Sequence, residues 1–98
     1  MVGEHASLSV TPGREADFES AFAQAGAIIA SMDGFGRLTL SRCLERPATC
    51  PLLVEWASLE DHTVGFRGSA DHQHWRQMLH HFYEPFPVVE HYEKVQSA

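Results

Sequence analysis

The stretch FESAFAQAGAIIASMDG, residues 18–34, decides the fold class. Its apolar residues recur at intervals of three and four, which is the spacing of one face of an α-helix. Asp33 and Gly34 should end this helix, because glycine readily takes the left-handed conformation that closes many helices. On the N-terminal side, Thr11 is expected to cap the helix and Pro12 to occupy its first position. The apolar stripe consists of Phe18, Ala21, Phe22, Ala25, Ile28, Ile29 and Met32.

Extended segments lie on both sides of this helix. Residues 5–10 alternate small polar with apolar side chains, which predicts a half-buried strand. Residues 35–45 alternate in the same way and predict a second strand, and residues 51–57 predict a third. The turn at residues 46–49 contains a proline that pre-sets the backbone for a turn. It therefore joins the second and third strands as an antiparallel hairpin. One face of the second strand carries Leu38, Leu40 and Leu44.

The C-terminal half predicts a broken helix followed by a strand. Residues 58–61, Ser-Leu-Glu-Asp, match a capping box and should open a short helix. Gly68 interrupts it, and Ser69 starts a second helical piece that ends before Pro85. Residues 88–95 alternate again and predict the last strand. The apolar stripe of the second helical piece is Trp75, Met78, Leu79 and Phe82.

The resulting order over residues 1–98 is β-α-β-β-α-β in a single domain. This order predicts an α+β protein with a ferredoxin-like antiparallel sheet and helices on one face. The other face of the sheet then needs a cover, since apolar sheet faces are usually buried against a partner. We therefore expect a homodimer that packs sheet against sheet. Trp56 or Tyr92, with their neighbours on the same face, should lose water contact in that interface.

Composition and charge exclude several classes of protein. The formal net charge is −6, and Lys94 is the only lysine. Nucleic acids and anionic membrane surfaces both require a basic patch, and none is present. No apolar run is long enough for a transmembrane helix, and the N-terminus lacks the pattern of a signal peptide. The protein is expected to be cytoplasmic, with Cys43 and Cys50 as free thiols.

Four segments carry a resemblance to a known family. They are VTPGREADFESAF, GFGRLTLSRCLERP, LLVEWASLEDHTVGFRGSADHQHWRQML and HYEKV. Together they resemble the antibiotic biosynthesis monooxygenase domain, in which the Pro-Gly-x-Glu helix start, the Glu-Trp strand end and the Phe-x-x-Ser helix break recur. The resemblance covers residues 5–95 and implies a dimeric α+β barrel. Some members oxidise aromatic polyketides without metal or flavin, others degrade haem, and others have no known activity.

The haem-degrading branch does not fit this chain. That branch depends on an asparagine on the first strand and on a tryptophan and a histidine on the later helices. The matching positions here are Ala6, Phe66 and Arg76. None of the three agrees, so the resemblance implies no haem chemistry.

A candidate site follows from the helix break. A helix interrupted at Gly68 covers the sheet less tightly than a continuous one, and the small Ala6 leaves room beneath it. His72 would face this gap and act as the proton acceptor, because a neutral imidazole is a suitable base near neutral pH. His62 would assist His72 or orient it. The side chains expected to contact a substrate are Trp56, Phe66, Trp75 and Arg76. The structural alternative is that these histidines are hydrogen-bonded to backbone and that the aromatic residues are core.

The sequence leaves more than one function open. One is a cofactor-independent, monooxygenase-like oxidoreductase acting on a small aromatic or quinol-type molecule. Another is a dimeric module that binds a small ligand without turning it over, and a third is a structural subunit of an assembly. The seven histidines do not pair at the helical spacing of a metal site, so no metal and no cofactor are expected.

Overall fold

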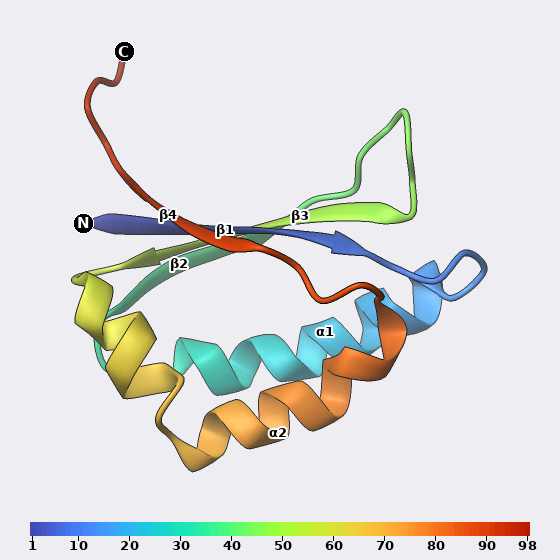
Figure 1. Ribbon diagram of the computed structural model, residues 1–98, viewed down its shortest axis with the longest axis horizontal. Coiled ribbons are helices and arrows are strands. Elements are labelled where there is room, and N and C mark those ends of the chain that lie inside the picture. The colour runs from blue at the N-terminus through green and yellow to red at the C-terminus, as the bar shows by residue number, and fades with distance from the viewer.

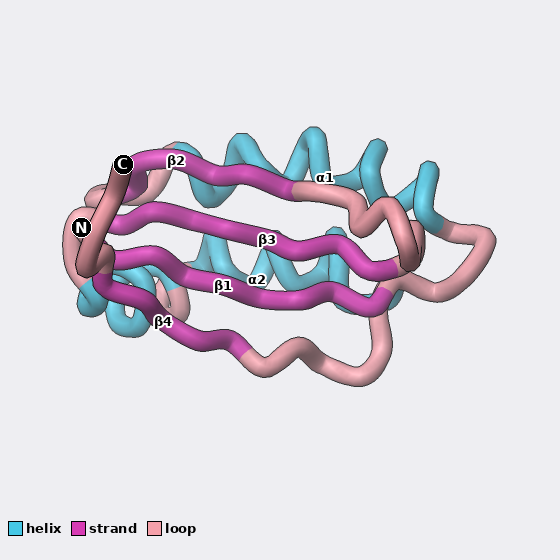
Figure 2. The backbone as a smooth tube through the Cα atoms, turned by 90° about the horizontal axis from the view of Figure 1, so that it is seen from above, coloured by secondary structure: helices cyan, strands magenta, loops and turns pink.

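The computed structural model describes all residues 1–98 and has two layers, a sheet and a layer of helices beneath it (Figure 1). The four strands pair antiparallel in the order β2-β3-β1-β4, which Figure 2 shows from above. The expected ferredoxin-like β-α-β-β-α-β fold is confirmed. No helix is both long and apolar enough to cross a membrane. The elements are β1 (Val2–Ser9), α1 (Glu15–Ala30), β2 (Phe35–Leu40), β3 (Thr49–Trp56), η1 (Asp61–Phe66), α2 (Ala70–Leu79), η2 (His80–Phe82) and β4 (Val89–Glu93).

The register of the central strands decides what each face of the sheet carries. Val2 pairs with Trp56, and Glu4 pairs with Val54, so these residues share the face toward the helices. Trp56 is 0% exposed there. The expectation that Trp56 would lie in a partner interface is therefore wrong, because the register turns it into the core of the single chain. The open face instead carries Leu53 and Tyr92, which are 49% and 53% exposed.

Helix α1 follows the predicted stripe but begins later than expected. Phe18, Phe22, Ala25 and Ile29 are buried against the sheet. The helix begins at Glu15, after Arg14, and Thr11 does not cap it with its side chain. The cause is Gly13, whose φ of 91° is incompatible with a helix and makes residues 11–14 a turn. The helix also ends earlier than predicted, at Ala30, and Gly34 takes the left-handed conformation in the turn that leads to β2.

Strand β2 is shorter than predicted, ending at Leu40 rather than at residue 45. The backbone N–H of Ser41 still donates to the carbonyl of Pro51 over 2.9 Å. Proline has no N–H to return that bond, so regular pairing stops here. Leu44, which was expected to share a strand face with Leu38 and Leu40, lies exposed in the loop that follows. Strand β4 also ends early, at Glu93, because its partner β1 begins at Val2.

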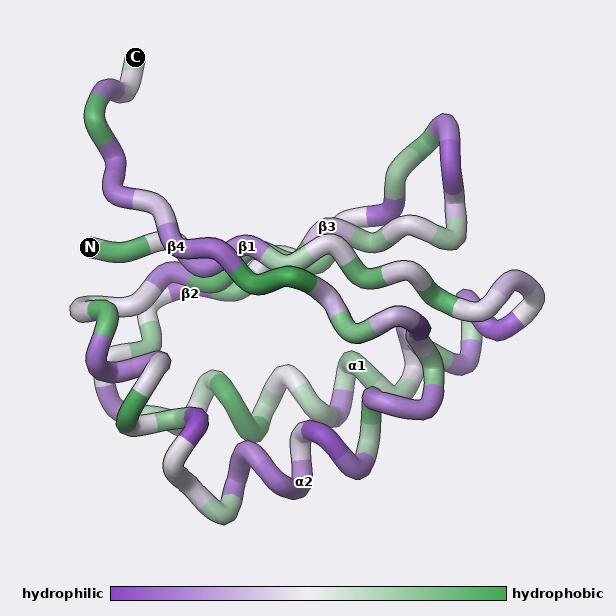
Figure 3. Tube along the Cα trace, in the orientation of Figure 1, coloured by the Kyte–Doolittle hydropathy of each residue, from purple (hydrophilic) through white to green (hydrophobic).

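The helix break occurs where it was predicted. The Ser58 hydroxyl accepts a hydrogen bond from the Asp61 N–H, but the helix that follows, η1, has π-helical geometry. At Gly68 a Cβ atom would lie 2.6 Å from the Val64 carbonyl oxygen, so only glycine fits this close turn. Ser69 then caps α2 by accepting from the His72 N–H. Most of α2 is hydrophilic (Figure 3), and it buries Trp75 and Leu79.

Candidate functional site

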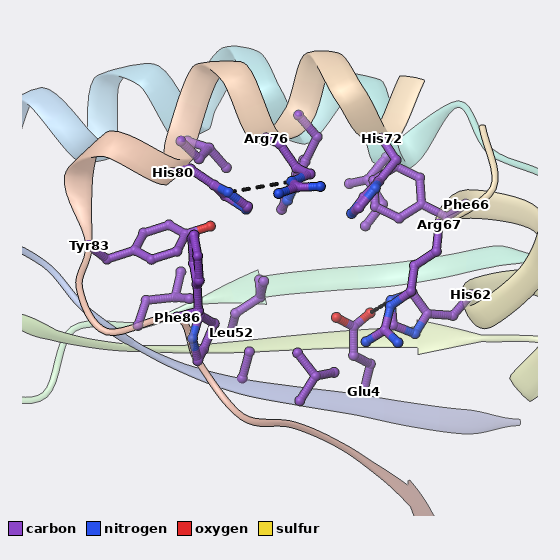
Figure 4. A pocket seen from close by; sticks show the side chains of 17 residues that line it. Glu4, Leu52, His62, Phe66, Arg67, His72, Arg76, His80, Tyr83 and Phe86 are labelled. Carbon is purple, nitrogen blue, oxygen red and sulfur yellow. Dashed lines mark hydrogen bonds and ion pairs between the residues drawn. The ribbon is translucent and has the colours of Figure 1, made fainter. Parts of the chain in front are cut away.

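A cavity of about 260 Å³ lies between the sheet and the segment from η1 to β4. The inner face of β1 forms its floor, and η1 and α2 form its far wall (Figure 4). The predicted gap beneath the broken helix therefore exists in this structure. Its lining residues are Glu4, Ala6, Leu8, Ile29, Leu52, His62, Phe66, Arg67, His72, Trp75, Arg76, Leu79, His80, Tyr83, Phe86, Pro87 and Val89.

Five of the six side chains singled out from the sequence line this cavity. His62 and Phe66 come from η1, and His72, Trp75 and Arg76 come from α2. Trp56 is the exception, since it does not line the cavity. It lies behind the wall, where its indole Nε1–H donates to Glu4 Oε1 over 3.0 Å. Trp56 is therefore a core residue that holds Glu4, a cavity residue, through this hydrogen bond.

Aromatic rings meet edge to face along the helical wall. The rings of Phe66 and Trp75 lie 5.8 Å apart at an interplanar angle of 84°. The rings of Phe66 and His72 lie 5.0 Å apart at 80°. Tyr83 and Phe86 close the opposite end of the cavity (Figure 4). Walls of this kind accept a flat, apolar ligand, because aromatic side chains interact favourably with another ring by stacking or by edge contact.

His72 presents a neutral imidazole to the cavity. Its backbone N–H is fixed by the Ser69 hydroxyl over 3.2 Å, and its ring is half-buried. Burial lowers the pKa of His72 below its ordinary value of 6.5, and the charges of Arg76 and Arg67 lower it further. A histidine with a lowered pKa is unprotonated at neutral pH. It can therefore accept a proton from a bound molecule.

His62 is the more deeply buried of the two histidines and has hydrogen-bond partners on both ring nitrogens. Its Nε2 lies 3.3 Å from Glu4 Oε1, and its Nδ1 lies 2.8 Å from His91 Nε2. Burial lowers the pKa of His62 to about 4, and the charges of Arg67, His91 and His72 add to the effect. His62 is therefore neutral at pH 7, so its contact with Glu4 is a hydrogen bond rather than an ion pair.

Glu4 is one of the polar cavity residues that the sequence analysis missed. Its side chain is buried on the floor, where burial raises the pKa of its carboxyl group. The hydrogen bond from Trp56 and the charge of Arg67 oppose that rise. The alternation of Ala6 and Leu8 could have found it, because Glu4 continues the same face. The predicted strand began one residue too late, at His5, to include it.

Two arginines stand at the mouth of the cavity. Arg67 and Arg76 are both exposed, and no carboxylate lies within ion-pair distance of either. The only side-chain hydrogen bond of Arg76 runs from its Nε to His80 Nδ1 over 3.4 Å. The mouth is therefore positively charged, although the whole chain carries −6. Such a mouth attracts a ligand that bears an anionic group.

Tyr83 adds a hydroxyl group to the end of the cavity opposite Glu4. Burial raises the pKa of Tyr83 to about 12, so the phenol keeps its proton at any physiological pH. It can donate a hydrogen bond to a ligand oxygen. No three His, Cys, Asp or Glu side chains converge on a point that would suit a metal ion.

Comparison with known proteins places the whole chain among relatives of one kind. The model of the antibiotic biosynthesis monooxygenase family matches residues 1–78. YczJ of Bacillus subtilis (strain 168), an uncharacterised protein, is 52% identical over 95 residues, which are 97% of this chain and all of that one.

Solved structures agree with this placement. One is the crystal structure of a Bordetella bronchiseptica protein that carries the name antibiotic biosynthesis monooxygenase. It is 40% identical to this chain, with a TM-score of 0.92 over 97% of both chains. SnoaB from Streptomyces nogalater, a cofactor-independent oxygenase, is 21% identical with a TM-score of 0.85 over 98% of this chain and 94% of that one. At that identity SnoaB supports the fold alone. The family match over residues 1–78 and the 40% identity with the Bordetella bronchiseptica protein together show that the chain belongs to the antibiotic biosynthesis monooxygenase family.

Proposed function

We propose that this protein is a cofactor-independent, monooxygenase-like oxidoreductase that acts on a small aromatic or quinol-type molecule. The observation that carries the proposal is the cavity itself, in which the unprotonated His72 stands beside the rings of Phe66 and Trp75. Membership of a monooxygenase family agrees with it. The cavity has both elements that such a reaction needs, a base and a surface that holds a flat ring.

The chemistry requires little more than a positioned base. An aromatic substrate with a ring CH₂ group loses one proton and becomes an electron-rich carbanion. The carbanion gives one electron to O₂, and the resulting radical and superoxide combine into a peroxide anion. The peroxide takes up a proton, and loss of water leaves a carbonyl group. One oxygen atom of O₂ enters the product and the other enters water, so the reaction needs no outside reductant.

The roles of the lining residues follow from their positions. His72 accepts the first proton, and Phe66 and Trp75 hold the ring beside it. Arg76 at the mouth stabilises the negative charge that develops on the substrate when the proton leaves. His62 orients the floor of the cavity through its hydrogen bond with Glu4.

Oxygen uptake tests the proposal directly. We expect the purified protein to consume O₂ with at least one member of a panel of anthrones and quinols in metal-free, chelated buffer. With an anthrone, one O₂ should be consumed for each new carbonyl group formed. Heat-denatured protein measures the autoxidation of the panel and serves as the control.

A different result would favour the second function. If panel members bind tightly, by calorimetry, yet no O₂ is consumed above autoxidation, the oxygenase proposal is wrong. The protein would then be a binding module for small aromatic ligands.

We also propose that two copies associate through the open face of the sheet. The helices cover only one face (Figure 1), and the other exposes Leu53 on β3 and Tyr92 on β4. His5 lies next to Tyr92 on this face, with the two rings 6.2 Å apart. A central strand with a half-exposed leucine is a favourable surface to bury against a second copy.

A charge at Leu53 should separate the two copies. We expect Leu53→Glu to raise the dissociation constant of the dimer by at least about tenfold, because association would then bury a carboxylate on each copy. Sedimentation equilibrium at micromolar concentration measures it. Val64→Glu is the matched control, since Val64 is also an exposed apolar residue, at 68% against 49% for Leu53, but lies on η1, on the helical side. A wild-type protein that is monomeric in this measurement would refute the dimer.

A further inference from the structure

Three titratable side chains form one hydrogen-bonded chain at the edge of the cavity. Glu4 Oε1 lies 3.3 Å from His62 Nε2, and His62 Nδ1 lies 2.8 Å from His91 Nε2. Figure 4 shows the first of these contacts as a dashed line. The three residues come from β1, η1 and β4, so the fold brings together segments that are far apart in the sequence.

The chain runs from the buried cavity to the surface. Glu4 and His62 line the cavity and are 6% and 3% exposed. His91 does not line the cavity. It is half-buried on the edge strand β4, where it lines a broad surface groove together with Leu59 and Lys94. One end of the chain therefore contacts a bound ligand and the other end contacts water.

The surroundings hold these groups in line. The Trp56 indole donates to Glu4 Oε1 and also stacks on His62, with the ring centres 5.5 Å apart at 24°. Phe66 stacks against the His62 ring at 6.4 Å and 28°. The rings of Trp56, Phe66 and His62 thus form one aromatic cluster that holds the imidazole of His62, with one nitrogen directed to Glu4 and the other to His91.

We propose that Glu4, His62 and His91 form a proton relay between the cavity and solvent. Each step moves one proton along an existing hydrogen bond. When His91 carries protons on both nitrogens, its Nε2 proton passes to His62 Nδ1, and the Nε2 proton of His62 passes to the Glu4 carboxylate. The result is a neutral His91, a neutral His62 in its other tautomer and a protonated Glu4. The reverse sequence carries a proton from the cavity to water.

The electrostatics suit such a relay. Burial raises the pKa of Glu4, so this carboxyl group can hold a proton for the cavity. Burial lowers the pKa of His62 to about 4, so His62 passes a proton on without trapping it as a charged imidazolium. The charged and titratable groups that act on the pair are Arg67, beside η1, and His72 of α2, together with His91 itself.

The relay rests on the proposed function and adds a second proton route to it. His72 exchanges protons with the ligand from the helical wall, whereas Glu4 does so from the floor of the cavity. Because the peroxide anion must be protonated, a proton supplied from water through Glu4 allows His72 to keep the proton it first removed until water leaves.

The test begins with the wild-type protein and needs no substrate. The Glu4 side-chain ¹³C shift and the ring ¹⁵N shifts of His62 and His91 are followed by NMR as the pH is lowered. We expect His62 to change from the Nε2–H to the Nδ1–H tautomer at the pH where Glu4 gains its proton, while its ring remains neutral. Glu4→Gln should abolish the change, whereas Glu60→Gln, at an exposed position just before η1, should leave it in place. A His62 tautomer that does not follow the protonation of Glu4 overturns the relay.

Chemical rescue by imidazole provides a second test of the relay. We expect His91→Ala to lower the rate of oxygen uptake by about tenfold or more, and added imidazole to restore it, because a small base can replace a missing proton carrier but not a missing packing contact. His74→Ala, on the exposed side of α2, is the control. Turnover that is unchanged in His91→Ala, or reduced but insensitive to imidazole, argues against the relay while leaving the oxygenase intact. Absence of turnover in the wild type with a coupled tautomer change argues against the oxygenase alone.

Discussion

Replacing Trp56 with alanine should lower the free energy of unfolding by about 3–5 kcal/mol, the range for truncating a fully buried tryptophan. The indole is 0% exposed and packs against Phe35 and Phe66. Its N–H also satisfies Glu4, so truncation leaves a buried carboxyl group with one partner fewer. Urea denaturation followed by circular dichroism measures the change. For a domain of this size, a loss at the upper end removes a large part of the total stability.

Trp56→Phe separates packing from hydrogen bonding. Phenylalanine keeps most of the ring volume and removes only the N–H donor. We expect it to lower the stability by about 1–3 kcal/mol, the cost of a polar group left partly unsatisfied. Because Trp56 lies in the core of one chain, neither variant should change the dissociation constant of a folded dimer. A Trp56→Ala protein of wild-type stability that is monomeric would show instead that Trp56 belongs to an interface.

Replacing His72 with alanine should reduce oxygen uptake by about a hundredfold to ten-thousandfold, the usual contribution of a general base. The protein should stay folded, because the Ser69 cap bonds the backbone N–H of residue 72 and not its ring. We expect its melting temperature to fall by less than about 8 °C, since a loss of about 1 kcal/mol lowers the melting temperature of a domain of this length by about 4–8 °C. Initial rates and thermal melts of the same preparation provide both measurements.

The pH dependence of wild-type turnover gives a further check on His72. The base works only when unprotonated, so activity is present above its pKa and is lost as the pH falls through it. Since burial and the nearby arginines lower the pKa of His72, the acidic limb of the profile should lie below 6.5. His74→Ala is the matched control, two residues along the same helix and exposed. A folded His72→Ala protein with wild-type turnover would assign the base to another residue.

The features that the sequence predicted well are those set by local periodicity. The stripe through Phe18, Phe22 and Ile29 fixed α1, because one helix face can be identified from spacing alone. Gly34 and Gly68 correctly marked the turns that follow α1 and η1, since the backbone at both positions disfavours a larger residue. The predicted helix break at Gly68 also implied a gap beneath α2.

The features that the sequence did not predict depend on pairing between distant segments. Alternation along β3 shows that Trp56 and Glu55 face opposite sides, but only the pairing with β1 decides which of them enters the core. The contact of Glu4 with His62 joins residues 58 positions apart, and no local pattern encodes it. The early end of β2 likewise depended on Pro51 lying opposite Ser41.

The pleat of β1 has a consequence for how proteins of this architecture diversify. Glu4, Ala6 and Leu8 point inward, while Gly3, His5 and Ser7 point to the open face. Substitutions at even-numbered positions therefore alter what the cavity admits, and those at odd-numbered positions alter the outer surface. Mutational libraries can vary the two sets separately, so ligand preference can be evolved without disturbing the outer surface. A deletion within this strand exchanges the two sets, which makes its length more constrained than its composition.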